Sequence, residues 1–198
     1  MKIFCQNGAD VTVYCGHTSG HKKKPNDLKD GVKIERCGLN IQHKKNIALR
    51  SLSYASFLIG VFFKLLKLKK DCRVIAVTNP PFNSLLLFIV SKIKELNYEY
   101  FLHDLYPEGL IALRSLDRKS MLVKIWLRLN KMSYKRAQKL FVLGRDMKKL
   151  VSTQYDILEE DIKYLPHWSA TDIRRPLAFN ESKFCKEWGL NNHFVVQY

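Results

Sequence analysis

The chain is poor in acidic residues and has no organised set of cysteines. It carries 18 Asp and Glu against 34 Lys and Arg in 198 residues, a formal net charge of +16. Its five cysteines are scattered without a C-x-x-C pair, so the sequence predicts neither a disulfide framework nor a zinc site, and a reducing cytoplasm is the expected environment. The excess of positive charge predicts an anionic partner such as phosphate, nucleic acid or an acidic membrane leaflet.

Signals for export or membrane crossing are also missing. The start MKIFCQNGAD lacks the basic-then-apolar layout of a signal peptide. The longest apolar run, Tyr54 to Phe63, is stopped by Lys64, short of the roughly 20 residues that span a bilayer. We therefore expect no transmembrane helix. Repeats and low-complexity segments are absent too, and a hydrophobic content of 46% can supply a substantial core.

Predicted strands and helices alternate along the chain. The expected strands are Val11 to Cys15, Val32 to Cys37, Arg73 to Thr78, Tyr98 to His103, Lys139 to Leu143, Ile162 to Leu165 and Phe194 to Tyr198. The expected helices are Ala48 to Lys70, Pro81 to Leu96, Leu116 to Ala137, Gly144 to Thr153 and Glu181 to Trp188. Gly20 to Gly31 is expected to be an exposed loop. This alternation predicts an α/β fold with a doubly wound, mostly parallel sheet flanked by helices.

The alternation of predicted strands and helices is interrupted after His167 by polar turn formers and Pro176. We place an interdomain linker near Asp172 to Asn180. The first domain is expected over residues 1–175, and residues 176–198 are expected to hold the linker and the start of a second domain, because one helix and one strand are too little for a complete domain.

Polar residues follow two of the predicted strands at their carboxyl ends, where open parallel sheets build ligand sites. Asn79 could hydrogen-bond a ligand or the main chain of the neighbouring loop, and His103 with Asp104 could orient and partly deprotonate a hydroxyl group. Both have structural alternatives. Asn79 can simply begin a turn before Pro80, and Asp104 can cap the helix expected after Pro107.

Other loops supply weaker candidates. Glu108 either faces the crevice or favours the positive first turn of a helix. Arg145 could meet a phosphate, although arginines are more often solvated at the surface. His167 and Asp172 could line a cleft near a hinge, whereas interdomain packing explains Trp168 more simply than stacking on a ligand.

A cationic stripe is expected on one helix. Its members are Lys124, Arg128, Lys131 and Lys135, which recur at helical spacing. The opposite face, expected to pack on the sheet, carries Met121, Leu122, Ile125, Leu129 and Met132. The stripe could hold the chain at an anionic membrane surface, with a second contact from Leu65, Leu66 and Leu68; an ordinary solvated face is the alternative.

A nucleic-acid-binding module is a less favoured hypothesis. The basic residues follow helix surfaces, and the sequence contains none of the common DNA- or RNA-binding motifs. We therefore expect no specific nucleic-acid partner.

Five segments, in order, resemble a known family: TNPP after one strand, HDLYPE after the next, then KLFVLGRDMKKLV, YLPHWSATDIRRP and a closing FVVQY. Together they resemble the N-terminal, acceptor-side half of family 4 glycosyltransferases of the GT-B architecture, notably those that build bacterial exopolysaccharide, O-antigen and capsule. The resemblance covers about Asn7 to the end of the chain. It implies a Rossmann-like domain facing a donor-binding domain across a cleft, and sugar transfer that retains anomeric configuration.

The resemblance also implies partners and roles. A nucleotide-sugar is the donor substrate, neither a metal nor another cofactor is required, and the acceptor is an oligosaccharide or is linked to a polyprenyl diphosphate at the inner face of the cell membrane. Asp104 and Glu108 match the acids of the family's DLWPE-like motif, and His103 and Tyr106 stand at positions that vary. The expected catalytic residues are Asp104 and His103. The expected substrate-binding residues are Asn79, Tyr106, Glu108, Arg145, His167 and Asp172.

The sequence departs from the family pattern at both ends. It lacks the first strand, the glycine-rich turn, most of the first helix and nearly all of the donor domain, including its paired glutamates. We therefore expect a glycosyltransferase fragment that is inactive alone, or a non-catalytic acceptor-side subunit of a two-chain enzyme. The strands beside the absent one are expected to have unpaired edges.

Overall fold

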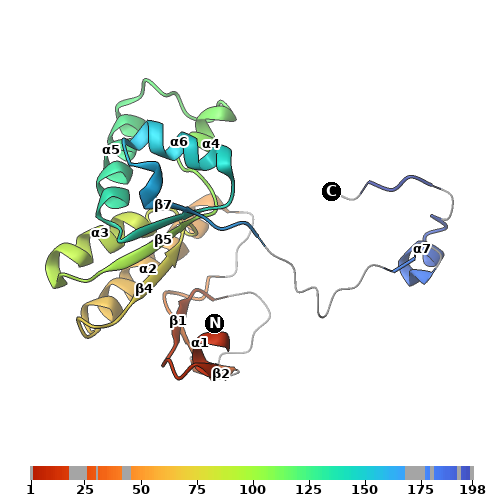
Figure 1. Cartoon of the computed structure of the whole chain (residues 1–198), viewed down its shortest axis with the longest axis horizontal. Helices are drawn as coiled ribbons and strands as arrows, with labels where there is room; N and C mark the ends of the chain where they lie inside the picture. The colour runs from red at the N-terminus through yellow and green to blue at the C-terminus, as the bar shows by residue number, and fades with distance from the viewer. Residues whose placement is uncertain are drawn as a thin grey trace. The chain divides into compact units, whose positions relative to one another are not determined.

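A computed structural model describes residues 2–17, 26–29, 31–41, 46–167, 177–178, 181–190 and 193–196. The chain divides into two units, Met1–Leu165 and Pro166–Tyr198. Nearly all regular structure described belongs to the first unit, which has the α/β architecture expected from the alternating pattern (Figure 1).

A small sheet follows the short helix α1 (Lys2–Gln6) and has the order β1-β3-β2. Strands β1 (Thr12–Cys15) and β3 (Val32–Arg36) are parallel, and β2 (Asn26–Lys29) is antiparallel to β3. The prediction of a loop over residues 20–31 was wrong for β2. A polar strand can still pair at the edge of a sheet, and Gly31, with a φ of +82°, lies in the connection to β3.

The larger sheet contains four parallel strands in sequential order. They are β4 (Val74–Val77), β5 (Tyr98–Leu102), β6 (Lys139–Val142) and β7 (Ile162–Tyr164). Val77 lies opposite Phe101, Leu102 opposite Val142, and Val142 opposite Tyr164. The strands therefore end level with one another, and the parallel, Rossmann-like sheet predicted from the sequence is confirmed.

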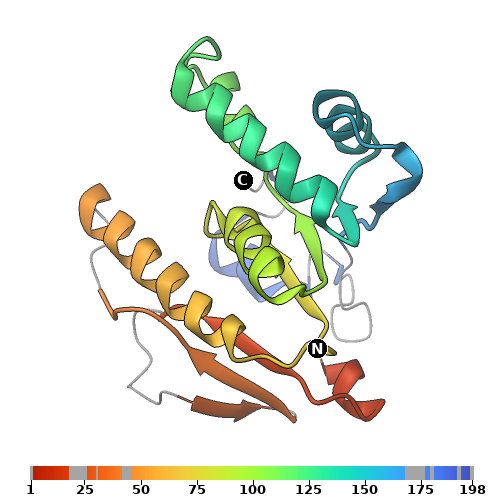
Figure 2. The same cartoon turned by 90° about the vertical axis from the view of Figure 1, so that its left-hand side faces the viewer.

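Helices cover one face of this sheet. The covering helices are α2 (Ile47–Leu66), α3 (Asn83–Lys94), α5 (Met121–Arg136) and α6 (Arg145–Tyr155), and a short helix α4 (Glu108–Ala112) and a 3-10 turn η1 (Glu159–Asp161) lie in connections. Helix α2 contacts α3, and α3 contacts α5, so these three form a layer (Figure 2). Asn46 is the N-cap of α2, and its side chain accepts hydrogen bonds from the N–H groups of Ala48 and Leu49.

The core lies between the helices and the inner face of the sheet. Alternate strand residues point into it, because side chains on a strand change sides at each residue. Tyr98, Tyr100 and Leu102 of β5 are buried there. The Tyr98 hydroxyl donates to the carbonyl of Ser133 on α5, which satisfies a buried polar group while fixing the helix on the sheet.

The opposite face of the larger sheet is only partly covered by the residues that the structure describes. Ile75 and Val77 of β4 remain 39% and 41% exposed. Beside them, the rings of Phe101 and Phe141 stack with their centroids 4.3 Å apart. Parallel sheets ordinarily have both faces covered, so this apolar face is unusual for the fold.

The described strands form two sheets instead of one. Strand β1 pairs only with β3 and β4 pairs only with β5 among the described residues, so each is the edge of its sheet. Unpaired edges were expected on the two strands beside the family's absent first strand, and whether β1 and β4 are those two strands stays a prediction. A row of backbone N–H and C=O groups is consequently open on each strand.

The second unit contains the short helix α7 (Lys183–Glu187), which Ser182 caps by accepting a hydrogen bond from the N–H of Cys185. The expected strand over residues 194–198 is not formed at residues 194–196, the part that the structure describes. An apolar run is a strand only where it finds a pairing partner, and none of the described residues pairs with it.

Candidate functional site at the carboxyl ends of the parallel strands

The ends of β4 and β5 bring three predicted residues to one edge of the sheet. Asn79 lies two residues beyond β4, and His103 and Asp104 directly follow β5. These strands are neighbours and parallel with matched ends, and neighbouring strands lie about 4.8 Å apart. All three residues are exposed. A substrate at this edge could therefore reach Asn79, His103 and Asp104 together.

Thr78 fixes the backbone between the two strand ends. Its Oγ1 accepts hydrogen bonds from the N–H of His103 at 2.8 Å and the N–H of Asp104 at 3.4 Å, and donates to the Phe101 carbonyl at 3.1 Å. Thr78 is only 3% exposed. Sequence reasoning missed this role, because threonine at the end of an apolar run was interpreted only as part of the strand.

Asn83 fixes the turn that presents Asn79. Its side-chain amide donates to the carbonyls of Val77 at 3.0 Å and Asn79 at 3.1 Å. The Asn79 backbone therefore belongs to an ordered turn, as the turn interpretation predicted, while the residue remains exposed. Asn83 was not singled out from the sequence, because the helix was expected to begin at Pro81, two residues earlier than it does.

The helix expected after Pro107 is present, but Asp104, whose alternative role was to cap it, does not do so. Helix α4 starts at Glu108 with Pro107 at the N-cap position and has no side-chain cap hydrogen bond. The peptide bonds before Pro80 and Pro107 are both cis. Asp104 is exposed three residues before this cap, so the capping alternative has no support in the hydrogen bonds of α4.

Glu108 and Tyr106 contribute to packing between helices. The Glu108 carboxylate accepts hydrogen bonds from the Tyr155 hydroxyl and from Nε2 of Gln154, both on α6. The Tyr106 carbonyl accepts from the side-chain amide of Asn130 on α5. Glu108 also stands in the first turn of α4, as its structural alternative predicted. These contacts hold the loop after β5 against two helices.

The Tyr155 hydroxyl is strongly biased toward its neutral form. Burial raises the pKa of Tyr155, and the nearby negative charge of Glu108 raises this pKa further. Tyr155 therefore remains a hydrogen-bond donor to Glu108 over the whole neutral range. One oxygen of Glu108, Oε2, is buried without a hydrogen-bond partner among the described residues.

Arg145 begins α6, immediately after Gly144 at the N-cap position, so it follows the end of β6 at the same edge of the sheet. Its guanidinium lies 5.8 Å from the centroid of the Tyr164 ring on β7, within the range of a cation–π contact. Arg145 is exposed. The arginine is thus oriented by an aromatic neighbour and its outer side is open to an anionic ligand.

The remaining predicted residues are not part of this edge in the structure. His167 is exposed and belongs to the second unit, Pro166–Tyr198. Asp172 and Trp168 lie outside the described residues. The proposed role of these three residues near a hinge stays a prediction.

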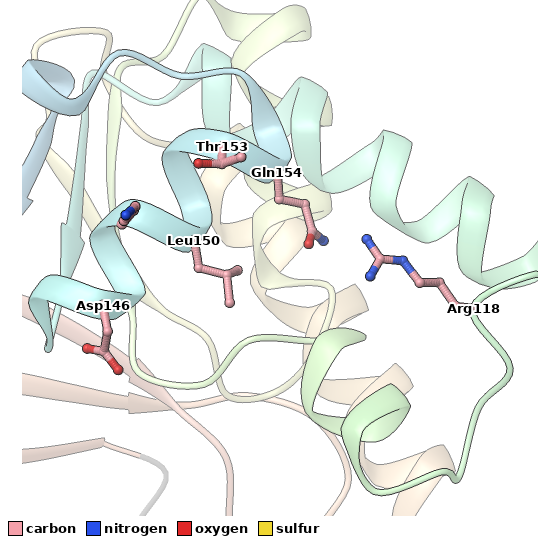
Figure 3. A pocket seen from close by; sticks show the side chains of 6 residues that line it. Arg118, Asp146, Leu150, Thr153 and Gln154 are labelled. Carbon is pink, nitrogen blue, oxygen red and sulfur yellow. The ribbon is translucent and has the colours of Figure 1, made fainter.

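A hollow of about 610 Å³ lies beside α6. Its lining consists of Arg118, Asp146, Lys149, Leu150, Thr153 and Gln154. Arg118 comes from the loop before α5 and points toward Gln154, as Figure 3 shows. Sequence reasoning missed Arg118, because a loop arginine in a chain this basic carries no distinguishing pattern.

The predicted orientation of α5 was wrong. Met121, Leu122, Ile125 and Met132 were expected to pack on the sheet, but all four are exposed, and Leu129 is half-buried. The buried side instead carries Val123, Asn130, Ser133 and Tyr134. Hydrogen bonds at Asn130 and Ser133 explain this result, since polar side chains can be buried when they are satisfied.

The cationic residues of α5 face outward, as predicted. Lys124, Arg128 and Lys135 are exposed and Lys131 is half-buried. Lys135 and Lys131 pair with Asp156 at 2.8 and 3.6 Å. The outward side of α5 therefore combines cationic and apolar side chains, whereas the sequence predicted two opposite faces.

Comparison with known proteins gives no family assignment. No family model matches the chain, and no curated protein matches it. The described residues also contain no group of three His, Cys, Asp or Glu side chains that could hold a metal ion.

Proposed function

We propose that this chain is the acceptor-side lobe of a two-lobed, retaining glycosyltransferase of the GT-B type that builds cell-surface polysaccharide. The observation that carries the proposal is the joint position of Asn79, His103 and Asp104 at the carboxyl edge of β4 and β5. Open parallel sheets bind ligands at this edge. The ordered sequence segments that resemble family 4 enzymes support the same assignment.

The proposed chemistry assigns different tasks to the three residues. Asp104, with His103 beside it, orients the acceptor hydroxyl and takes up its proton as the hydroxyl oxygen bonds to the anomeric carbon of the donor. The bond from that carbon to the nucleotide phosphate breaks, and the nucleoside diphosphate leaves. Asn79 donates hydrogen bonds to the acceptor sugar. The nucleotide-sugar is held by the donor lobe, which this chain requires for turnover.

Two features support a role for this chain as part of a larger assembly. The edges of β1 and β4 are open within the described residues, and the apolar side chains of Ile75 and Val77 are partly exposed. Both features also favour a second candidate, a non-catalytic acceptor-side subunit completed by another chain. The coding sequence on either side of this reading frame distinguishes the two, because only the first candidate requires the donor lobe in the same polypeptide.

Acceptor binding tests the proposal directly. The probe is N-acetylglucosamine linked through diphosphate to farnesol, titrated calorimetrically into the 198-residue chain. We expect Asp104→Asn and Asn79→Ala each to weaken binding about tenfold, while Asp117→Asn, an exposed acid in the loop before α5, leaves it unchanged. Equal affinity of all four proteins, or no binding by any of them, contradicts the proposal. In an enzyme joined to its donor lobe, Asp104→Asn should lower transfer about tenfold or more.

A further inference from the structure

The outward face of the α2–α3–α5 layer carries an unusual amount of exposed apolar surface. These side chains are distributed over all three helices, which lie side by side in Figure 2. They are Leu52, Ile59 and Phe63 of α2, Ile89 and Ile93 of α3, and Met121, Leu122, Ile125 and Met132 of α5. A helix on the surface of a soluble domain normally presents polar side chains outward. This layer departs from that rule on each helix.

Helix α2 is apolar on two opposite sides. Val61 and Leu65 are buried in the core, whereas Leu52, Ile59 and Phe63 are 51%, 59% and 58% exposed. Spacings of seven and four residues put the exposed three on one side of the helix. By length and composition alone, α2 could also cross a membrane, and it is the one helix of that kind among the described residues.

Packing contacts attach the second half of α2 to the domain. A side chain added at Gly60 would approach the Gly38 nitrogen at 3.2 Å, so the helix and the segment after β3 are in close contact. Lys64 also pairs with Glu35 of β3 at 2.8 Å. A helix held in this way lies along the surface of the domain and presents one side outward.

The same three helices contain no Asp or Glu, although they carry two basic residues in α2, two in α3 and five in α5. Lys92, Lys124 and Arg128 are exposed on the layer, and Lys67 and Lys69 are exposed just after α2. Their long side chains can extend beyond apolar neighbours to reach a charged surface. The face therefore combines exposed apolar groups with an excess of positive charge, although Glu95 after α3 pairs with Lys70 and Asp156 pairs with Lys131 and Lys135 at its margins.

We propose that the outward face of the α2–α3–α5 layer binds the surface of an anionic lipid bilayer. Leu52, Ile59 and Phe63 enter the boundary between headgroups and acyl chains, with α2 parallel to the membrane plane. The surrounding lysines and arginines contact anionic headgroups. Charge complementarity favours an anionic surface, because the three helices are basic and contain no acids, and their exposed apolar side chains match the boundary between headgroups and acyl chains of a bilayer. The proposal does not depend on the proposed sugar transfer.

Sedimentation with vesicles tests this proposal on the 198-residue chain. We expect at least tenfold stronger retention by phosphatidylcholine vesicles containing roughly 30% phosphatidylglycerol than by phosphatidylcholine alone, and release of most of the protein at about 1 M NaCl. Equal retention by the two kinds of vesicle, or no retention by either, overturns the proposal without reference to any variant.

Matched variants separate apolar insertion from general charge attraction. Ile59→Gln with Phe63→Gln should lower retention at least fivefold, while Leu113→Gln with Leu158→Gln, at positions 76% and 65% exposed outside the layer, should not. Lys124→Glu with Arg128→Glu should lower retention more than Lys139→Glu with Lys163→Glu, which changes the net charge equally on strands β6 and β7. All substituted positions are exposed, and circular dichroism verifies the fold of each variant.

Two results would contradict the assignment of this face. If each variant pair behaves like its control, the membrane is bound elsewhere. The other result has three parts: the chain is a dimer without vesicles, Ile59→Gln with Phe63→Gln makes it monomeric, and vesicles fail to retain the parent chain. In that case the face is a contact between two copies of the chain. Acceptor binding by the soluble chain is unaffected in either case, so failure here is distinct from failure of the proposed function.

Discussion

The hydroxyl oxygen of Thr78, at the end of β4, accepts a hydrogen bond from the backbone N–H of His103, at the end of β5, over 2.8 Å. This contact joins the two loops that present Asn79 and Asp104. Because it depends on one buried hydroxyl, the geometry of the candidate site can be altered without touching any residue that would contact substrate.

Thr78→Val removes this acceptor while preserving the shape of the side chain. We expect a loss of about 1 to 3 kcal/mol in the free energy of unfolding, because the buried Thr78 side chain no longer accepts from the His103 N–H or donates to the Phe101 carbonyl. Thr78→Ser retains the hydroxyl and should lose clearly less. Urea denaturation measures both variants, and equal stability of Thr78→Val and the parent chain would show that the contact is unimportant.

The hydroxyl of Tyr155 joins α6 to Glu108 of α4. Tyr155→Phe should lower the free energy of unfolding by about 1 to 2 kcal/mol, since the buried Glu108 carboxylate loses a donor. Combined with Glu108→Gln, the two effects should not add, because both changes act on the same contact. Additive losses in a double-mutant cycle measured by urea denaturation would argue against this coupling.

Buried tyrosines predict a loss of stability at alkaline pH. Burial raises the pKa of Tyr98, Tyr100, Tyr134 and Tyr155 above the usual value near 10.0. Below that pH these groups are neutral in both folded and unfolded chains, so their contribution is complete. Above it only the unfolded chain ionises readily, and the free energy of unfolding falls as pH rises.

Urea midpoints measured together with absorbance at the tyrosinate band test this alkaline effect. We expect the midpoint to decrease above about pH 10, with ionisation of the buried tyrosines accompanying unfolding. Tyr134→Phe should make the decrease shallower. A midpoint that stays constant while all tyrosines ionise in the folded chain would contradict the prediction.

The open edge at β4 predicts self-association at high protein concentration. Ile75→Lys places a charge beside this edge and should reduce association, with little effect on the melting temperature because the residue is 39% exposed. Leu158→Lys adds the same charge at a site between α6 and η1 and serves as the control. Sedimentation velocity measures both variants, and equal association would assign the contact to another surface.

The sequence predicted the fold well where the local pattern and the tertiary structure agree. The strands over β4 to β7 were short apolar runs bounded by turn formers, and their parallel order followed from the intervening helices. The same logic predicted that Asn79 and His103 share an edge. The sequence could not reveal that Thr78 and Asn83 fix that edge, because their partners are backbone groups of distant or irregular segments.

Helix α5 shows why its orientation could not be predicted from hydrophobicity. A ranking by apolar character puts Met121 and Ile125 inside and Asn130 outside. In the fold, the Tyr106 carbonyl offers Asn130 a buried partner, and a tyrosine cluster that includes Tyr134 occupies the space against the sheet. Such partners come from other parts of the chain, so periodicity alone carries no information about them.

The most direct test of the central claim maps acceptor binding residue by residue. Amide chemical shifts of the isotope-labelled chain would be followed by NMR as the diphosphate-linked N-acetylglucosamine probe is added. The proposed site predicts the largest changes at Asn79, His103 and Asp104, with smaller changes at Arg145, and loss of these changes in Asp104→Asn. Shifts confined to the hollow around Arg118 and Lys149, with the β4 and β5 ends unaffected, would contradict the claim.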